Sequence, residues 1–240
     1  MIHIHFPTID STNAYLKKHY ASLENLTFVS ADYQSRGKGR LDRVWEANQG
    51  ENLLFSVLLR KPDLSLGVGF FSLLAAFAVA ETLEDMALSD VQIKWPNDVY
   101  VEGKKITGIL LEGNLPEYLV IGVGVNVNQT TFPMDLRHEP TSVALQLGSK
   151  VDLSEFRDKI FAKFESLLSK KPEGTELLTF YNSHDYLVGK HVAIGDQEGE
   201  YAGVDNRFGL RLKTGGGVVS ILSGEISEYK TSRGGMCFCL

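Results

Sequence analysis

One stretch of eight residues restricts the fold more than any other. Residues 52–59 read Asn-Leu-Leu-Phe-Ser-Val-Leu-Leu, so apolar side chains stand on both faces of the segment. A short run of this kind predicts a β-strand that is buried on both sides. Residues 67–87, which are rich in alanine, leucine and phenylalanine, predict a long core helix.

The rest of the chain divides into two parts. Strands are expected at 2–6, 26–31, 91–95, 99–101, 105–112 and 118–127, and helices after a cap at Asp10 or Ser11 and near 141–147, 154–169 and 174–186. From Gly189 onward the hydrophobic period shortens, and glycine-rich breaks separate five short strands, which predict a small barrel. We therefore expect a boundary near residue 187, with domains at 1–187 and 188–230 and a disordered tail at 231–240.

Bulk composition excludes several classes of protein. The formal net charge is −6 and the pI is near 5.5, which argues against general nucleic-acid or membrane-surface binding. No stretch approaches the ~20 apolar residues of a membrane span. The only cysteines, Cys237 and Cys239, lie in the tail and cannot staple a core, which points to a cytoplasmic protein.

A basic stretch stands out against this acidic background. Residues 34–45 read Gln-Ser-Arg-Gly-Lys-Gly-Arg-Leu-Asp-Arg-Val-Trp, in which four basic side chains and one acidic one leave a charge of +3. Glycine lets backbone amides approach a ligand closely, and arginine grips phosphate or carboxylate with a planar fork. The stretch is either a loop that folds over an anionic small molecule or a solvated basic turn.

A second cluster reads Lys94-Trp-Pro-Asn-Asp98 and is followed by Lys105 on the returning strand of a hairpin. Proline ends the strand, so Asn97 and Asp98 stand at its exit. An aspartate beside phosphates typically holds Mg²⁺ or orients a nucleophile. A polar turn with a surface lysine is the alternative.

Taken together, these patterns resemble the biotin protein ligases, also called holocarboxylase synthetases. The matching segments occur in the family's order over nearly the whole chain. They are Asp10-Ser-Thr-Asn13, Gln34, Gly37-Lys-Gly-Arg-Leu-x-Arg-x-Trp45, Lys94–Asp98, Lys105-x-x-Gly108-Ile-Leu, Gly122-x-Gly-x-Asn-Val127 and Ser223-Gly-Glu-Ile-Ser227. Asp42 departs from the family, which commonly has glycine there, and the N-terminal winged helix of some members is not found in this sequence.

The resemblance implies an α/β fold, with a mixed-sheet catalytic domain of the biotin/lipoate ligase type and a small SH3-like barrel. It implies the activity of a biotin–[biotin carboxyl-carrier protein] ligase. Biotin and ATP, with Mg²⁺, form biotinyl-5′-AMP, and biotin is then transferred to a lysine of a biotin carboxyl carrier domain. No specific DNA binding and no membrane association are expected, and a homodimer is left open.

The resemblance also implies a role for each matching residue. The catalytic residues are Lys105, Arg40 and Asp98, and Asp98 is expected to orient or deprotonate the acceptor lysine. The biotin-binding residues are Ser11, Thr12, Asn13, Gln34, Gly37, Lys38, Gly39, Arg40, Trp45, Lys105 and Gly108. The ATP-binding residues are Arg40, Arg43, Trp45, Asn97, Lys105 and Asn126, and Asn126 is also the expected metal contact, with Mg²⁺ held mainly through the phosphates.

Two other functions stay open. A lipoate or octanoate ligase or transferase shares the catalytic fold but lacks the Gly-Lys-Gly-Arg loop and the Lys-Trp-Pro-Asn-Asp segment. A non-catalytic module that recruits a partner through its C-terminal barrel leaves the charged and amide groups of the first domain without a purpose.

Overall fold

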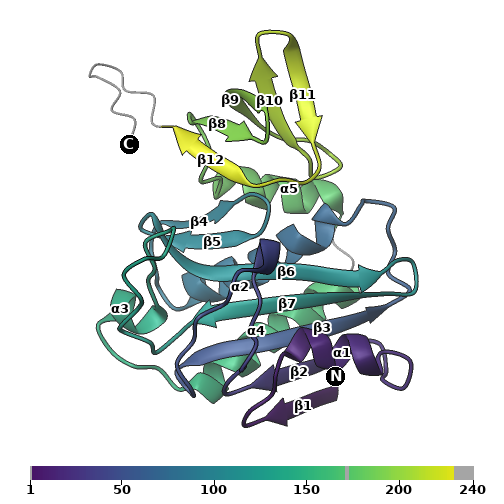
Figure 1. Cartoon of the computed structure of the whole chain (residues 1–240), viewed down its shortest axis with the longest axis vertical. Coiled ribbons are helices and arrows are strands. Elements are labelled where there is room, and N and C mark those ends of the chain that lie inside the picture. Colours follow the sequence, from purple (N-terminus) through teal and green to yellow (C-terminus); the bar gives the residue numbers. More distant parts are fainter. Residues whose placement is uncertain (1, 171–172, 230–240) are drawn as a thin grey trace.

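The computed structural model describes residues 2–170 and 173–229. Two β-sheets lie one above the other along the long axis of the molecule (Figure 1). The strands of the first sheet are β1 (Ile2–Phe6), β2 (Thr27–Ala31), β3 (Asn52–Arg60), β4 (Val91–Lys94), β5 (Asp98–Val101), β6 (Lys104–Asn114) and β7 (Tyr118–Asn126). Those of the second sheet are β8 (His191–Ile194), β9 (Gln197–Val204), β10 (Leu210–Thr214), β11 (Gly217–Ile221) and β12 (Ile226–Tyr229). The helices are α1 (Thr12–His19), α2 (Gly69–Asp85), α3 (Val143–Leu147), α4 (Leu153–Lys170) and α5 (Gly174–Ser183).

The first sheet has the strand order β1-β2-β3-β7-β6-β5-β4. The first two strands are parallel and all other neighbours are antiparallel, so the sheet is mixed. Strand β3 lies inside it, between β2 and β7, and all of its residues except Arg60 are buried. The strand that the sequence predicted to be buried on both faces is therefore confirmed.

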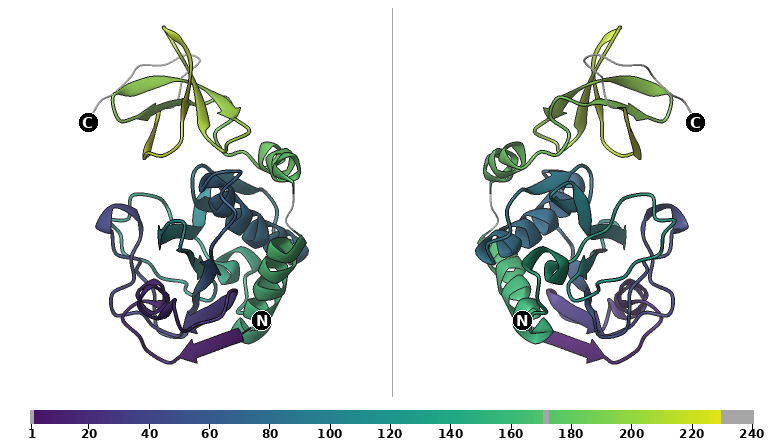
Figure 2. Two further views of the ribbon diagram at one scale, coloured as in Figure 1. Left: turned by 90° about the vertical axis from the view of Figure 1, so that its right-hand side faces the viewer. Right: turned by 90° about the vertical axis from the view of Figure 1, so that its left-hand side faces the viewer.

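Helices cover the two faces of this sheet unequally (Figure 2). On one face α2 and α4 pack against the apolar side chains that include Phe55 and Val57 of β3. On the other face the short helix α1 packs, where Leu16 meets Leu58 in a small separate cluster. Because successive strand residues point to opposite faces, Ser56 faces the α1 side. That side is left open beside α1.

The second sheet has the order β11-β10-β9-β8-β12, and all its neighbours are antiparallel. The five predicted strands are confirmed. In the described part of the chain, however, no pairing joins the outer strands β11 and β12, so the predicted closed barrel is not confirmed. Strand β8 begins at His191, and the boundary near residue 187 stays a prediction. In the ranges that the structure covers, no helix combines the length and the apolar character needed to cross a membrane.

Buried contacts join the two sheets. The indole Nε1 of Trp95 donates to the Phe208 carbonyl at 2.9 Å, and both side chains are almost fully buried. Asp185, which follows α5, accepts hydrogen bonds from the hydroxyls of Tyr181 and Tyr201 at 3.1 and 2.6 Å. Burial raises the pKa of Asp185 although these bonds oppose it. The second sheet is thus held at the end of the first sheet where β4 and β5 lie (Figure 1). The predicted disordered tail, with Cys237 and Cys239, lies outside the described residues.

Candidate functional site

A cavity opens on the α1 side of the first sheet. Its walls come from the start of α1, the basic stretch, strands β3 to β7, the segment before α3, and the segment that joins β11 to β12. It brings together all of the predicted site residues except Gly37 and Asn126. These are Ser11, Thr12, Asn13, Gln34, Lys38, Gly39, Arg40, Arg43, Trp45, Asn97, Asp98, Lys105 and Gly108. Segments that are far apart in the sequence therefore share one hollow.

Neutral polar groups form the inner end of the cavity. Ser11 is the N-cap of α1, and its hydroxyl accepts the amide of Ala14 at 3.3 Å, which confirms the predicted cap. The side-chain carbonyl of Gln34 accepts the amide of Thr12 at 2.7 Å. The hydroxyl of Thr12 lies 2.6 Å from that of Ser56. These groups are fixed by one another before any ligand arrives.

The basic stretch forms a small hairpin over the cavity. Lys38 pairs with Val44 in an isolated bridge, the amide of Gly39 donates to the Arg43 carbonyl at 2.8 Å, and the amide of Trp45 donates to the Gly37 carbonyl at 3.0 Å. Leu41, at the tip, has a φ of 54°, a left-handed conformation that is uncommon for a side chain of this kind, and it is 67% exposed. The hairpin is therefore tied at its base and strained at its tip. The interpretation as a loop at a binding site is supported over that of a solvated turn.

Trp45 lies flat on two strands at the centre of the cavity. A Cβ atom at Gly108 of β6 would stand 2.7 Å from its Cζ3, and one at Gly124 of β7 would stand 2.5 Å from its Cε2. Only glycine leaves room for the indole at these two positions. The indole Nε1 is buried and, within the described residues, has no hydrogen-bond partner. Trp45 is thus a wall of the cavity with an unused donor.

Charged groups form the outer end. Lys105 Nζ lies 2.8 Å from Asp98 Oδ2, and the other carboxylate oxygen of Asp98 is buried with no partner among the described residues. Arg40 Nη1 donates to the side-chain oxygen of Asn97 at 3.2 Å, and the amide nitrogen of Asn97 donates to the Ile109 carbonyl at 2.8 Å. The side chains of Lys105 and Arg40 and the carboxylate of Asp98, which has one oxygen without a partner in the described structure, therefore converge on the same space.

The second sheet contributes to this end. Arg40 Nη2 donates to the carbonyl of Gly224 at 2.8 Å, and Arg43 lies 2.5 Å from the carboxylate of Glu225, which also pairs with Arg137. Both acceptors belong to the segment between β11 and β12. The sequence pattern at 223–227 had marked this segment without giving it a role. The structure shows that it holds the tip of the basic hairpin.

His138 and Lys94 line the cavity although neither was among the predicted site residues. Lys94 is 5% exposed, and its ammonium lies 5.6 Å from the ring centres of Tyr100 and Tyr186. Burial and, to a lesser extent, the positive charges of Lys94 and Lys105 lower the pKa of His138 to about 4, although Asp98 opposes them. His138 is therefore neutral near pH 7. It stands in an irregular segment without any motif, so only the folded chain reveals it.

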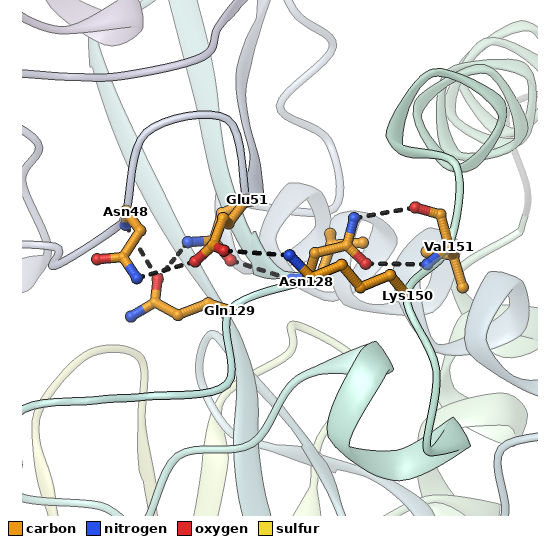
Figure 3. A network of polar contacts seen from close by, with 8 residues as sticks. Asn48, Glu51, Asn128, Gln129, Lys150 and Val151 are labelled. Atoms are coloured by element: carbon orange, nitrogen blue, oxygen red, sulfur yellow. Dashed lines mark hydrogen bonds and ion pairs between the residues drawn. The ribbon is translucent and has the colours of Figure 1, made fainter.

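Two predicted residues lie behind the cavity wall. The side chain of Asn126 donates to the Thr141 carbonyl at 3.0 Å. Nearby amides form a network in which Asn128 exchanges two 2.9 Å hydrogen bonds with the backbone of Val151, and Gln129 accepts the amide of Asn48 at 3.0 Å (Figure 3). This network fastens the chain that leaves Trp45 to the chain that leaves β7. Gly37 acts through its backbone, which holds Trp45.

Comparisons with known proteins agree with this geometry. A sequence model of the biotin/lipoate A/B protein ligase family matches residues 5–126. The bifunctional ligase/repressor BirA of Bacillus subtilis is 34% identical over 213 residues, which are 83% of this chain and 65% of that protein. The biotin–[acetyl-CoA-carboxylase] ligase of Mycobacterium tuberculosis is 30% identical over 92% of this chain and 86% of its own length. This chain thus spans slightly less than two thirds of the Bacillus protein.

Solved structures show the same relationship. The biotin protein ligase from Aquifex aeolicus in complex with biotin and ATP superposes with a TM-score of 0.85 and 30% sequence identity, and the match covers 96% of this chain and 99% of that one. The match includes both sheets of this chain, because it spans nearly its whole length. The chain therefore belongs to the biotin/lipoate A/B protein ligase family, and within that family it is similar to the biotin protein ligases.

Proposed function

We propose that this protein is an ATP-dependent biotin protein ligase. It forms biotinyl-5′-AMP from biotin and ATP and then transfers biotin to a lysine of a biotin carboxyl carrier domain. The observation that carries the proposal is a single cavity with a neutral, hydrogen-bonding inner end and a cationic outer end. Biotin has the same two ends, a polar uncharged ring and a carboxylate. The complex of the Aquifex protein with biotin and ATP supports the choice of both substrates.

Adenylation requires a carboxylate and a phosphate to meet, and their like charges repel. Lys105 and Arg40 stand where the two anions would meet, so their charges offset the repulsion and stabilise the charge that develops on the α-phosphate. Arg43, Asn97 and Trp45 lie around the same space and serve the nucleotide. Holding the reacting oxygen against the phosphorus supplies a further large share of the rate.

Transfer requires an acceptor amine that has lost its proton. Asp98 is placed for this role because Oδ2 is engaged by Lys105 at 2.8 Å while Oδ1 is buried with no partner in the described structure. An incoming lysine ammonium can donate to Oδ1, and the amine then attacks the carbonyl carbon of the mixed anhydride. An amide bond forms, the bond to the phosphate oxygen breaks, and AMP leaves. The basic hairpin covers the water-labile adenylate in the meantime.

Mg²⁺ fits this site as a companion of the nucleotide. No cluster of three or more histidine, cysteine, aspartate or glutamate side chains in the described residues can hold a metal by itself. Mg²⁺ commonly takes one or two protein oxygens together with substrate phosphates and water. The side-chain oxygen of Asn97 is a suitable donor beside the cavity, and Asn126 remains the donor that the sequence predicted. The ion would neutralise phosphate charge.

The second sheet would take part in both steps. Its link to Arg40 and Arg43 places it at the rim of the cavity, where the acceptor domain must approach. Its five antiparallel strands are consistent with the SH3-like module that we propose.

The matched family also includes lipoate ligases, so lipoate is the competing substrate. The test is to incubate the protein with MgATP, a biotin-acceptor domain and either biotin or lipoate, and to measure pyrophosphate and the mass of the acceptor. We expect pyrophosphate and a biotinylated acceptor only with biotin. A lipoylated acceptor, or no product with either acid, would contradict the proposal.

A matched variant separates the two steps. Asp98→Asn keeps the size of the side chain but removes the charge that attracts the acceptor ammonium. We expect single-turnover experiments to show adenylate that accumulates on the enzyme, with slow labelling of the acceptor.

A further inference from the structure

A short turn leads to two of the polar groups at the outer end of the cavity. Residues 95–97 join β4 to Asp98, which is the first residue of β5. The side-chain oxygen of Asn97 accepts a hydrogen bond from Arg40 at 3.2 Å. The carboxylate of Asp98 pairs with Lys105 at 2.8 Å. The position of this turn therefore decides whether these two polar groups meet the two cations.

Each residue of the turn is hydrogen-bonded to a different part of the molecule. The hydroxyl of Ser72 in α2 donates to the carbonyl of Pro96 at 2.6 Å. The side-chain nitrogen of Asn97 donates to the carbonyl of Ile109 in β6 at 2.8 Å. The remaining residue, Trp95, is bonded to the second sheet. The turn thus depends on one helix and on both sheets.

The bond between Trp95 and Phe208 is buried on both sides. The indole nitrogen lies 2.9 Å from the carbonyl oxygen, and the two residues are 2% and 1% exposed. Phe208 stands between β9 and β10, so the second sheet supplies the acceptor. Removing the donor would leave a buried carbonyl without its partner, which is costly. The second sheet therefore holds this turn directly, at a different point from its contact with the basic hairpin.

Phe208 adopts a strained backbone conformation at this place. Its φ is 62°, a left-handed value that is uncommon for a bulky side chain and easy for glycine. Its ring packs against that of Phe70 in α2, with 5.6 Å between the ring centres, and a Cβ atom at Gly69 would lie 3.0 Å from its own Cβ. Such strain persists where the surroundings hold a residue in place, and it is typical of functional sites.

The second sheet also fixes the direction of this carbonyl. The carboxylate of Asp205 accepts the amides of Arg207 and Gly209 at 2.8 and 2.9 Å. Its other oxygen accepts the hydroxyl of Ser220 in β11 at 2.5 Å. The amide of Phe208 donates to the carbonyl of Asp205 at 3.0 Å. The residue that bonds to the indole is therefore presented by a turn that is already formed within the second sheet.

We propose that Phe208 is a positioning residue for both chemical steps: by holding Trp95, it keeps the turn that leads into Asp98 in place. This inference rests on the proposed function, in which Asn97 serves the nucleotide and Asp98 serves the acceptor lysine. Phe208 does not line the cavity, so it acts on the substrates only through Trp95. The second sheet then contributes to the rate of the reaction as well as to the cover of the cavity.

A simpler role for the bond between Trp95 and Phe208 is to join the two sheets. A contact that is only structural contributes to stability, and a folded protein that lacks it keeps its rates at saturating substrate. A positioning contact also contributes to those rates, because a small displacement of a reacting group slows the chemistry greatly. The two roles therefore differ in what happens to the folded variant.

The experiment compares Trp95→Phe with the matched variant Tyr201→Phe. Each change removes the donor of one buried hydrogen bond between the two parts of the molecule, and the Tyr201 hydroxyl donates to Asp185, outside the cavity, at 2.6 Å. Both changes should lower the urea midpoint. Pyrophosphate release and acceptor labelling are then followed in single turnovers at saturating biotin and MgATP. Both steps should be at least about tenfold slower in Trp95→Phe alone.

Asp205→Ala carries the test if Trp95→Phe does not fold. Asp205 is partly exposed and does not line the cavity, so its loss should loosen the turn at Phe208 without opening the core. The same two steps should slow, by a smaller factor. The adenylate should stay on the enzyme, whereas loss of the link between the second sheet and Arg40 would release it. Retention of the adenylate thus separates the two contacts of the second sheet.

Unmodified rates of both steps in folded Trp95→Phe, or equal slowing in Tyr201→Phe, would overturn the inference. If Trp95→Phe does not fold, unmodified rates or escaping adenylate in Asp205→Ala would overturn it equally. An unmodified protein that forms neither pyrophosphate nor a biotinylated acceptor would instead contradict the proposed function.

Discussion

The two ends of the cavity are organised by different means. At the inner end, neutral groups such as Thr12 and Ser56 are buried and satisfy one another within one sheet and one helix. At the outer end, charged groups such as Arg40 and Arg43 are half-buried or exposed and are held from the second sheet by single contacts. The inner end can thus select a ligand by shape and hydrogen bonding. At the outer end, the few contacts to the second sheet leave the basic hairpin able to move when the reactants bind.

This difference sets the expected cost of substitutions. A change at the inner end should alter affinity, because the groups are already in place in the free protein. A change at the outer end should alter rates, because its charges offset the repulsion between the two reacting anions and stabilise the charge that develops during the reaction. The following experiments are arranged from the largest expected effect to the smallest.

Lys105→Ala should have the largest effect. Removing a preorganised cation from the reacting anions should slow adenylate formation by about 2–4 kcal/mol of activation free energy. Single-turnover pyrophosphate release measures this. The neighbouring Lys104→Ala is the control, since Lys104 pairs with Glu139 on the surface. Equal losses in the two variants would mean that position 105 is not special.

Gly108→Ala should disturb both ends at once. The added Cβ would meet Trp45 at 2.7 Å, and the indole must move out of its place between the two ends. We expect a loss of about 1–3 kcal/mol in unfolding free energy or in biotin binding, as in other overpacked sites. Gly215→Ala, where a Cβ meets nothing within 4 Å, is the control for urea unfolding and calorimetry. If Gly108→Ala behaves like this control, Trp45 is mobile and not a wall.

Arg40→Ala should release the basic hairpin. The change removes the hydrogen bonds to Gly224 and Asn97 and the grip on the phosphate. We expect biotinyl-5′-AMP to leave about tenfold faster, which corresponds to about 1.4 kcal/mol, and to label unrelated lysines in solution. The exposed Arg211→Ala is the control. Tight retention of the adenylate by Arg40→Ala would reduce the hairpin to a structural turn.

His138→Gln should have the smallest effect, visible only in pH dependence. The pKa of His138 is lowered from 6.5 to about 4 in the folded protein, so between these values the unfolded chain binds the proton more readily. Stability therefore falls as pH drops from about 6.5 toward 4, and glutamine should remove part of that slope. Urea midpoints measured at intervals of pH test this. Parallel slopes would show that the pKa of His138 is not lowered in the folded protein.

Local patterns in the sequence predicted much of this arrangement. The cap at Ser11 and the run at 52–59 each depend on a few neighbouring residues, and the structure confirms both elements. Arg40, Lys105 and Asp98 also stand in two dense local clusters, and the structure brings them together in the cavity, while their roles stay predictions.

What the sequence could not predict depends on distant contacts. The bond between Arg40 and Gly224 joins residues 184 positions apart, and neither position hints at its partner. His138 became part of the cavity only because an irregular segment folds back beside β5 and β6. Strand patterns also could not tell an open sheet from a closed barrel, because closure depends on pairing between β11 and β12.

The chain has only two tryptophans, and the fold gives each a different duty. The indole N–H of Trp95 is bonded to the Phe208 carbonyl where the two sheets meet, whereas the indole N–H of Trp45, at the cavity, has no partner among the residues that the structure describes. The protein thus carries two fluorescent reporters. Trp45 reports the entry of a ligand into the cavity, and Trp95 reports the contact between the two sheets. In a Trp45→Phe variant, only Trp95 fluoresces and reports the contact between the two sheets. Comparing this variant with the unmodified protein therefore separates the filling of the cavity from any movement of the second sheet.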